Sequence, residues 1–203
     1  FLRGVAINPA LAEALARGWS TGDSDVLAHI TDEGQFDALT VVDASGNVLH
    51  RFQNPGAHGD SLRGHSLVRR ALDTAIPASG TLAIAAAALA RENPSLEEDA
   101  AIAPPHPAES VHQEPALRDG MVIAAAVPVT RGARVVGVLL GSTLLNGHND
   151  LVDLIKDDVF QGETFEGREI GTTTLFLGDV RIATNVRTAA GDRAVGTRLS
   201  DEV

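Results

Sequence analysis

The sequence predicts an α+β fold in which antiparallel hairpins alternate with amphipathic helices. In residues 36–52, two β-prone runs flank the turn sequence Asp43-Ala44-Ser45-Gly46-Asn47, which is typical of a hairpin. Residues 121–129 and 135–140 are apolar on both faces, as central strands of a sheet are. The chain has 203 residues, enough to bury the core of one large or two modest domains.

The first thirty residues predict two helices. Residues 1–17 place Leu11, Leu15 and several alanines at helical spacing, with Asn8-Pro9 as a start signal and Gly18 as a stop signal. Residues 21–25, of sequence TGDSD, open a second, shorter helix that runs to about Ile30.

A polar loop over residues 53–60 leads to a third helix, predicted over residues 61–75. Its apolar residues lie on one side, and Asp60 or Ser61 supplies the N-terminal cap. Arg70 and Ser66 point away from that side, while His65 and Arg69 lie on its boundary. The buried face is expected to comprise Leu67, Val68, Ala71 and Leu72.

The middle of the chain gives conflicting signals. Residues 80–91 read GTLAIAAAALAR, and the alanines favour a helix by intrinsic propensity. Residues 92–120 hold five prolines and seven acidic residues with little apolar periodicity, which predicts a long surface insertion without regular structure.

The last third predicts a helix and a second hairpin. Asn149 or Asp150 caps a helix over residues 151–160, and Gly178-Asp179 turns a hairpin between residues 172–177 and 180–186. Residues 193–198 predict a third extended piece, and Ser200-Asp201-Glu202 has the chemistry of a helix N-terminus. Two or three strands cannot bury one face of a sheet, so this second unit is expected to be incomplete.

Several motifs in this region resemble the second module of the fused double Cache (Cache 3/Cache 2-type) sensor family. They are Ile170-Gly171-Thr172, FLGD at 176–179, RIATNV at 181–186, GDRAVGT at 191–197 and SDEV at 200–203. The sequence VVDASGNVL at 41–49 also resembles the first hairpin of a Cache module. The family comprises extracytoplasmic, PAS-like ligand-sensing regions of bacterial histidine kinases, chemotaxis receptors and cyclic-di-nucleotide enzymes.

The resemblance implies two modules. Residues 1–148 would form a helix and a PAS-like Cache module, a five-stranded antiparallel sheet with helices on one side, interrupted by the insertion at 92–120. Within it, residues 80–91 would be a strand. Residues 149–203 would hold a linking helix and the first strands of a truncated second PAS-like module.

Composition excludes several classes of partner and chemistry. Lys plus Arg number 16 against 27 Asp plus Glu, so a net charge of −11 disfavours nucleic acid and anionic membrane as direct partners. The absence of Cys excludes disulfides, thiolate metal sites and covalently attached haem. No apolar run approaches the ~20 residues that span a bilayer, so we expect the membrane anchor to lie in flanking segments.

Two motifs suggest enzymatic or metal chemistry, and both have simpler explanations. Gly59-Asp60-Ser61-Leu62 spells the nucleophile block of GDSL esterases, but no histidine follows His148 to act as general base, and the serine follows a hairpin. His106, Glu109 and His112 could ligate zinc, yet a proline-rich loop does not hold ligands at fixed geometry. We therefore predict no catalytic residue, no metal and no cofactor.

Candidate ligand contacts fall in both units. Small alanine side chains at 83–88 and 124–126 leave volume between sheet and helix, so a cavity is expected there with Arg63, His65 or Arg69 at its rim. In the second unit, Arg181, Asn185 and Arg193 could present donors to an anion. The simpler explanations are close helix packing and a solvated sheet face.

The resemblance implies extracytoplasmic sensing, in the periplasmic part of an inner-membrane protein. The expected receptor is a sensor histidine kinase, with a chemotaxis receptor as the alternative, and the expected ligand is a small molecule such as an organic anion. The full-length receptor is expected to be a homodimer. A GDSL-like esterase and a ligand-free dimerisation module are the competing classes.

Overall fold

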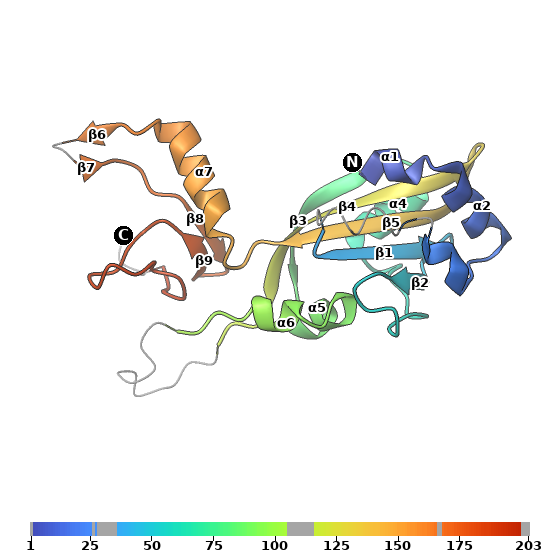
Figure 1. Cartoon of the computed structure of the whole chain (residues 1–203), viewed down its shortest axis with the longest axis horizontal. Coiled ribbons are helices and arrows are strands. Elements are labelled where there is room, and N and C mark those ends of the chain that lie inside the picture. Colours follow the sequence, from blue (N-terminus) through green and yellow to red (C-terminus); the bar gives the residue numbers. More distant parts are fainter. Residues whose placement is uncertain (1, 26, 28–35, 105–115, 166–167, 200–203) are drawn as a thin grey trace.

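The computed structural model describes residues 2–25, 27, 36–104, 116–165 and 168–199, and its larger lobe is built on a five-stranded sheet (Figure 1). The strand order is β2-β1-β5-β4-β3, and every neighbouring pair is antiparallel. The strands are β1 (Ala38–Asp43), β2 (Val48–Arg51), β3 (Ala78–Ile84), β4 (Gly120–Arg131) and β5 (Arg134–Leu144). The α+β class and the five-stranded antiparallel sheet predicted from the sequence are confirmed.

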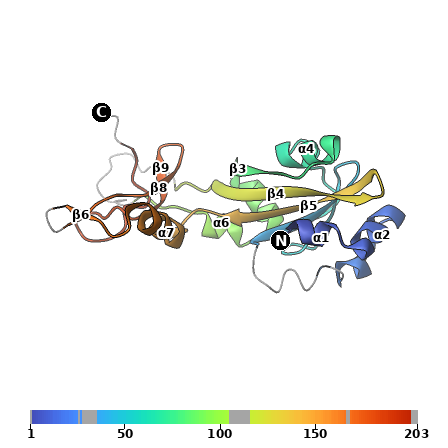
Figure 2. The same cartoon turned by 90° about the horizontal axis from the view of Figure 1, so that it is seen from above.

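Three helices contribute to the core on one face of this sheet. They are α4 (Ser66–Thr74), α5 (Ala86–Glu92) and α6 (Leu96–Asp99). Figure 2 shows α4 on that face, opposite the two N-terminal helices. Because side chains alternate across a strand, one set of positions on each strand meets these helices. The shared core includes Val68 and Ala71 from α4, Leu89 from α5, and Ala124 and Leu140 from the sheet.

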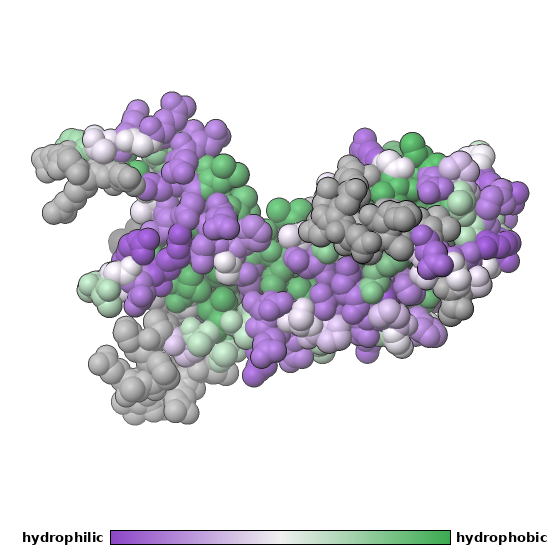
Figure 3. Space-filling view, in the orientation of Figure 1, coloured by the Kyte–Doolittle hydropathy of each residue, from purple (hydrophilic) through white to green (hydrophobic). Residues whose placement is uncertain are grey.

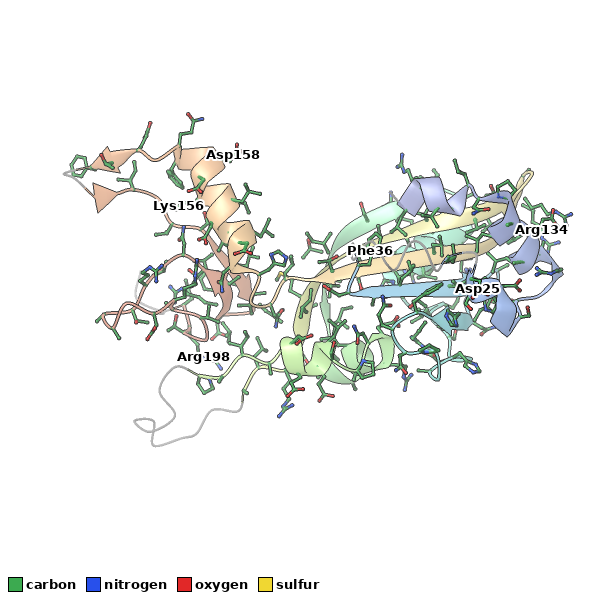
Figure 4. All side chains as sticks on the ribbon, viewed as in Figure 1. Asp25, Phe36, Arg134, Lys156, Asp158 and Arg198 are labelled. Atoms are coloured by element: carbon green, nitrogen blue, oxygen red, sulfur yellow. The ribbon has the colours of Figure 1, made fainter. Side chains whose placement is uncertain are left out.

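Helices also cover the opposite face, which corrects the prediction of helices on one side only. The helices α1 (Leu2–Ala6) and α2 (Pro9–Arg17) pack against Leu39, Val41 and Leu139. Two β5 glycines make this close approach possible: a Cβ at Gly137 would lie 2.9 Å from a Leu15 methyl, and one at Gly141 would lie 2.9 Å from a Leu2 methyl. Phe36 contributes to the same layer, beside the sheet (Figure 4).

The N-terminal predictions hold where the structure describes them. Asn8 caps α2 by accepting from the Ala10 amide at 2.9 Å, and Gly18 follows the helix with φ of 98°. Thr21–Ser24 forms a 3₁₀ turn, η1, and the rest of the second predicted helix lies largely outside the described residues.

Three predictions for the middle of the chain need correction. The third helix begins at Ser66, not at residue 61, and His65 occupies its N-cap position. Residues 80–91 are neither all strand nor all helix, because β3 ends at Ile84 and α5 begins at Ala86. The segment 92–120 is not wholly a surface loop: Leu96, Ala100 and Ile102 are buried, and Ile102 pairs with Leu117 in an isolated bridge.

The smaller lobe follows β5 and is built from α7 (Asn149–Phe160) and short hairpins. The hairpins are β6 (Thr164–Phe165) with β7 (Arg168–Glu169), which the sequence did not predict, and β8 (Thr174–Leu177) with β9 (Val180–Thr184), which it did. The predicted third piece is not a regular strand: Arg198 bridges to Val180 in β9, and Arg193 bridges to Arg187 just after β9. Residues 200–203 lie outside the described residues.

Where the lobes meet, a small apolar cluster joins them. Ile102 and Leu145 are buried with Val180 and Ile182. Hydrophobic surface gathers at this junction, whereas the outer surface of α7 is mostly hydrophilic (Figure 3). The described residues contain no helix long and apolar enough to cross a membrane.

Candidate functional site

A cavity of about 70 Å³ lies between the sheet, the segment that precedes α4, and the helices α5 and α6. The sequence predicted a cavity at this place from its alanines, and Ala88 and Ala124 line it. Three polar side chains, His65, Glu92 and Ser142, complete an otherwise apolar wall. The apolar lining residues are Leu62, Ile84, Ala88, Leu89, Leu96, Val122, Ala124 and Leu140.

His65 brings an unpartnered polar atom to this cavity. Its Nδ1 atom is buried and has no hydrogen-bond partner among the described residues, and its side chain makes no capping bond to α4. Burial lowers the pKa of His65, and the nearby charge of Glu92 opposes that shift only in part. The imidazole is therefore held neutral near pH 7, and its Nδ1 lacks a protein partner in the described structure.

Glu92 belongs to a buried ion-pair network that the sequence did not reveal. The Arg51 side chain is 1% exposed, and its Nε donates to Glu92 Oε1 at 2.9 Å. Its Nη1 and Nη2 donate to the two carboxylate oxygens of Asp60 at 2.6 and 2.9 Å, and Nη1 also donates to the Ala57 carbonyl at 2.8 Å. The Thr40 hydroxyl donates to the second Glu92 oxygen.

This network shifts the pKa values of Arg51 and Asp60. Burial alone would lower the pKa of Arg51, but the hydrogen bonds and charges of Asp60 and Glu92 outweigh it and raise the pKa. The Arg51 hydrogen bonds also lower the pKa of Asp60. The only hint in the sequence was an arginine inside a predicted strand, whose partner Glu92 is 41 residues away.

The GDSL-like block has a structural role. Asp60 is held by Arg51, and the Ser61 hydroxyl is directed to the Gly46 carbonyl at 3.4 Å. Ser61 also pairs with Asn47 in an isolated antiparallel bridge, within a sheet that has only antiparallel pairs. Neither Asp60 nor Ser61 caps α4, because that helix begins five residues after Ser61.

Arg63 and Arg69, predicted at the rim, are not among the residues that line the cavity. Both are exposed, and Arg63 pairs with Asp73 at 2.5 Å. Of the three first-unit candidates, the structure places only His65 at the cavity.

The three second-unit candidates cluster around β9, apart from the cavity. Arg193 donates hydrogen bonds to both carboxylate oxygens of Asp153 on α7, at 3.0 and 2.5 Å. It also donates to the Thr184 carbonyl at 2.8 Å. Arg181 donates to the Thr197 hydroxyl at 2.7 Å and stacks over Phe176. The side-chain Oδ1 of Asn185 accepts from the Thr173 backbone amide at 2.9 Å.

These contacts hold the small lobe together. Two donors remain buried without a partner in the described structure, Arg181 Nε and Asn185 Nδ2. Ligand contact by Arg181, Asn185 and Arg193 stays a prediction.

The zinc hypothesis falls on residues that the structure does not describe. His106, Glu109 and His112 all lie in the gap at 105–115. Among the described residues, no group of three or more His, Asp or Glu side chains is placed to hold a metal ion.

The C-terminal part of the chain matches a known family model. Residues 143–203 match the family model described as "Single cache domain 3". This range contains the motifs at 170–203 that carry the sequence resemblance. No curated protein matches the chain.

The chain also resembles several solved structures. One is an extracellular ligand-binding receptor from Desulfohalobium retbaense. The match covers 75% of this chain and 24% of the receptor chain, at 15% identity and a TM-score of 0.44. A domain of a sensory box/GGDEF family protein from Vibrio parahaemolyticus matches 90% and 61%, at 13% identity and a TM-score of 0.48.

The ligand-binding domain of the Pseudomonas fluorescens chemoreceptor CtaA, solved with L-leucine, also matches 90% of this chain and 61% of its own. Its identity is 14% and its TM-score is 0.43. The chain thus spans between a quarter and three fifths of the length of these three structures.

Proposed function

Because residues 143–203 of this chain match a Cache family model, we propose that the chain is a ligand-sensing region of a bacterial transmembrane signalling receptor. Cache domains are non-catalytic sensing modules, so enzymatic output would belong to other parts of the receptor. The region would lie outside the cytoplasmic membrane, with the membrane passage in flanking segments.

The observation that carries the proposal is the cavity at His65. Ligand sites are concave and mostly apolar, with a few polar groups that fix orientation, and this cavity has that composition. An unpartnered buried nitrogen is costly, because it has lost water without gaining a protein partner. A ligand that pairs with it would recover that cost.

The contacts around Asn146 offer a route from the cavity to the small lobe. Leu96 lines the cavity on α6, and the Ala100 carbonyl just after α6 accepts from the Asn146 side chain at 2.7 Å. Asn146 also accepts from the Met121 amide at 2.9 Å, and the next amide, Gly147, donates to Ile182 in β9 at 2.7 Å. A ligand that displaces α6 would therefore change the position of the β8–β9 hairpin. The shift between the two arrangements can be no larger than the difference in the ligand's affinity for them.

A matched pair of variants tests the cavity. Ala88 and Ala87 are both exposed neighbours on α5, but only Ala88 lines the cavity. We expect Ala88→Leu to abolish stabilisation by small-molecule ligands in a thermal-shift panel, and Ala87→Leu to keep it. A panel in which no compound stabilises the wild-type chain, or in which both variants respond alike, would count against the proposal.

We propose a sensor histidine kinase as the whole receptor, with a chemotaxis receptor as the alternative and a homodimer as its assembly. The sequence resemblance supports both receptor classes. The sequence of the whole receptor distinguishes them, since it would contain either a kinase core or a methyl-accepting signalling domain.

A GDSL-like esterase is the competing class. Hydrolysis of p-nitrophenyl acetate that is lost in Ser61→Ala would establish it. The hydrogen bond of Asp60 to Arg51 and the placement of Ser61 against Gly46 favour the sensor. The third class, a ligand-free dimerisation module, would give a dimer in solution that no small molecule stabilises.

A further inference from the structure

The charges around the cavity indicate which chemical class of ligand it takes. Arg51 has five N–H donors, and five acceptor contacts face them: Glu92 at Nε and Nη2, Asp60 at Nη1 and Nη2, and the Ala57 carbonyl at Nη1. No Arg51 donor is left for a carboxylate ligand, and Arg51 does not line the cavity.

The network beside the cavity is also electrically balanced. Asp60 meets a second cation, Arg91, at 3.5 Å, so two guanidinium groups face the two carboxylates of Asp60 and Glu92. An anion entering the cavity would meet the Glu92 carboxylate in its wall without a free cation, and it would lose its hydration. The organic anion expected from the sequence therefore does not fit this site.

From this arrangement, and given the sensing role proposed above, we infer that the cavity takes a small, uncharged, largely apolar molecule with one hydrogen-bonding group, which pairs with His65 Nδ1. A short-chain alcohol or ketone has this chemistry. The apolar part would face Leu89, Val122 and Leu140, which line the cavity.

The volume sets the size of the ligand. A cavity of ~150 Å³ holds benzene, so about 70 Å³ holds roughly half as many non-hydrogen atoms, about three. Ethanol is of this size, and so are its charged counterparts acetate and ethylammonium. Because binding energy per atom has a ceiling, we expect an affinity in the millimolar range at best.

The experiment is a titration of the chain, labelled with ¹⁵N in its histidine side chains, with ethanol, acetone, acetate and ethylammonium. We expect ethanol or acetone to shift the His65 Nδ1 resonance saturably at millimolar concentration, and the two ions to leave it unchanged at equal concentration. His65→Leu should lower the affinity for the neutral ligand by between about twofold and tenfold, which is the usual contribution of one hydrogen bond. His58→Leu, which removes an exposed histidine from the loop before Asp60, is the matched control and should bind as the wild type does.

The possible outcomes separate this inference from the sensing role. Saturable binding of acetate or ethylammonium that Ala88→Leu abolishes would overturn the neutral ligand class while supporting a sensing cavity. Binding of ethanol with equal affinity to the wild type and to His65→Leu would overturn the role of Nδ1. If no probe shifts His65 and no compound in the broader panel stabilises the chain, both the ligand class and the sensing role fail.

Discussion

The two lobes of the molecule differ in how completely their elements are packed. In the larger lobe, helices cover both faces of one sheet, and Val68, Val129 and Leu139 have no exposed surface. In the smaller lobe, α7 buries only Val152 among its residues, and Leu154 and Val159 remain 66% and 63% exposed. The cavity thus lies in the lobe with the firmer core, and the smaller lobe is the part that a ligand could move at lower cost.

The most deeply buried ion pairs also lie in the larger lobe, not in the smaller one. The larger lobe has Arg51 at 1% exposure with two carboxylate partners. The smaller lobe is tied by Arg193 and Asp153, whose side chains are 27% and 39% exposed. A buried ion pair is costly to break because its partner is left uncompensated, whereas an exposed pair is screened by water.

The largest expected effect is that of Arg51→Met. This change leaves Asp60 and Glu92 facing each other without their shared cation, and we expect it to lower the free energy of unfolding by about 3 kcal/mol or more. Arg63→Met, which breaks an exposed pair with Asp73, should cost less than about 1 kcal/mol. Urea denaturation of both variants gives the comparison, and equal losses would mean that burial does not distinguish the two pairs.

The next effect compares the two hydrophobic cores. Leu139→Ala should cost about 2–5 kcal/mol and destabilise the larger lobe as a whole. Ile182→Ala should cost nearer about 2 kcal/mol, because its cluster has four buried members among the described residues. Hydrogen exchange should show lost protection confined to β8 and β9 in Ile182→Ala, with β4 and β5 unchanged. A uniform loss across both lobes would show that they unfold as one unit.

Local chemistry explains what the sequence could predict. The β1–β2 and β8–β9 hairpins were predictable because their turns, at Asp43–Asn47 and Gly178-Asp179, are encoded by adjacent residues. The buried face of α4 was predictable from helical spacing. The division into modules at residue 148 stays a prediction.

Long-range partners explain what it could not predict. Asp60 looked like a helix cap because that is its commonest local role, but Arg51 holds it instead, and the helix starts later. In the cavity wall, His65 and Ala124 were foreseen from helix and strand pattern. Glu92 and Ser142 were not, because their positions depend on where distant segments pack.

A smaller loss of stability is expected in the smaller lobe, where the ion pair between Arg193 and Asp153 is only partly buried. Arg193→Gln removes the two-point contact with Asp153 and should lower stability by less than about 1 kcal/mol. Limited proteolysis should nevertheless cut faster between α7 and β9 in this variant than in Arg187→Gln, which removes an exposed arginine two residues after Asn185. Equal cleavage rates would show that Arg193 does not tie the two elements.

The same pair has a defined pH dependence. The hydrogen bond from Arg193 is the main reason that the pKa of Asp153 lies below 3.8. Its contribution to stability is present above pH 3.8 and is lost as the pH falls through the lower folded-state pKa. Wild type and Arg193→Gln should therefore converge in stability in strong acid.

The smallest expected effect on stability comes from the protonation of His65, which lines the cavity. Burial lowers the pKa of His65 below 6.5 in the folded chain, so near pH 6 the unfolded chain binds more protons at this residue. Stability is then full above pH 6.5 and falls as the pH drops below it. His50, whose pKa is lowered by burial and by the charge of His58, contributes with the same sign.

Melting temperatures measured from pH 7.5 to pH 5.5 should therefore fall less in His65→Leu than in the wild type, and least in the double variant His50→Leu/His65→Leu. A saturating cavity ligand that pairs with neutral His65 should steepen the wild-type dependence, since it stabilises the neutral folded form further. A slope that His65→Leu leaves unchanged would mean that the imidazole is not confined in the cavity wall. Protonation of His65 would then not affect the stability of the larger lobe, and pH would not distinguish it from the smaller lobe in this way.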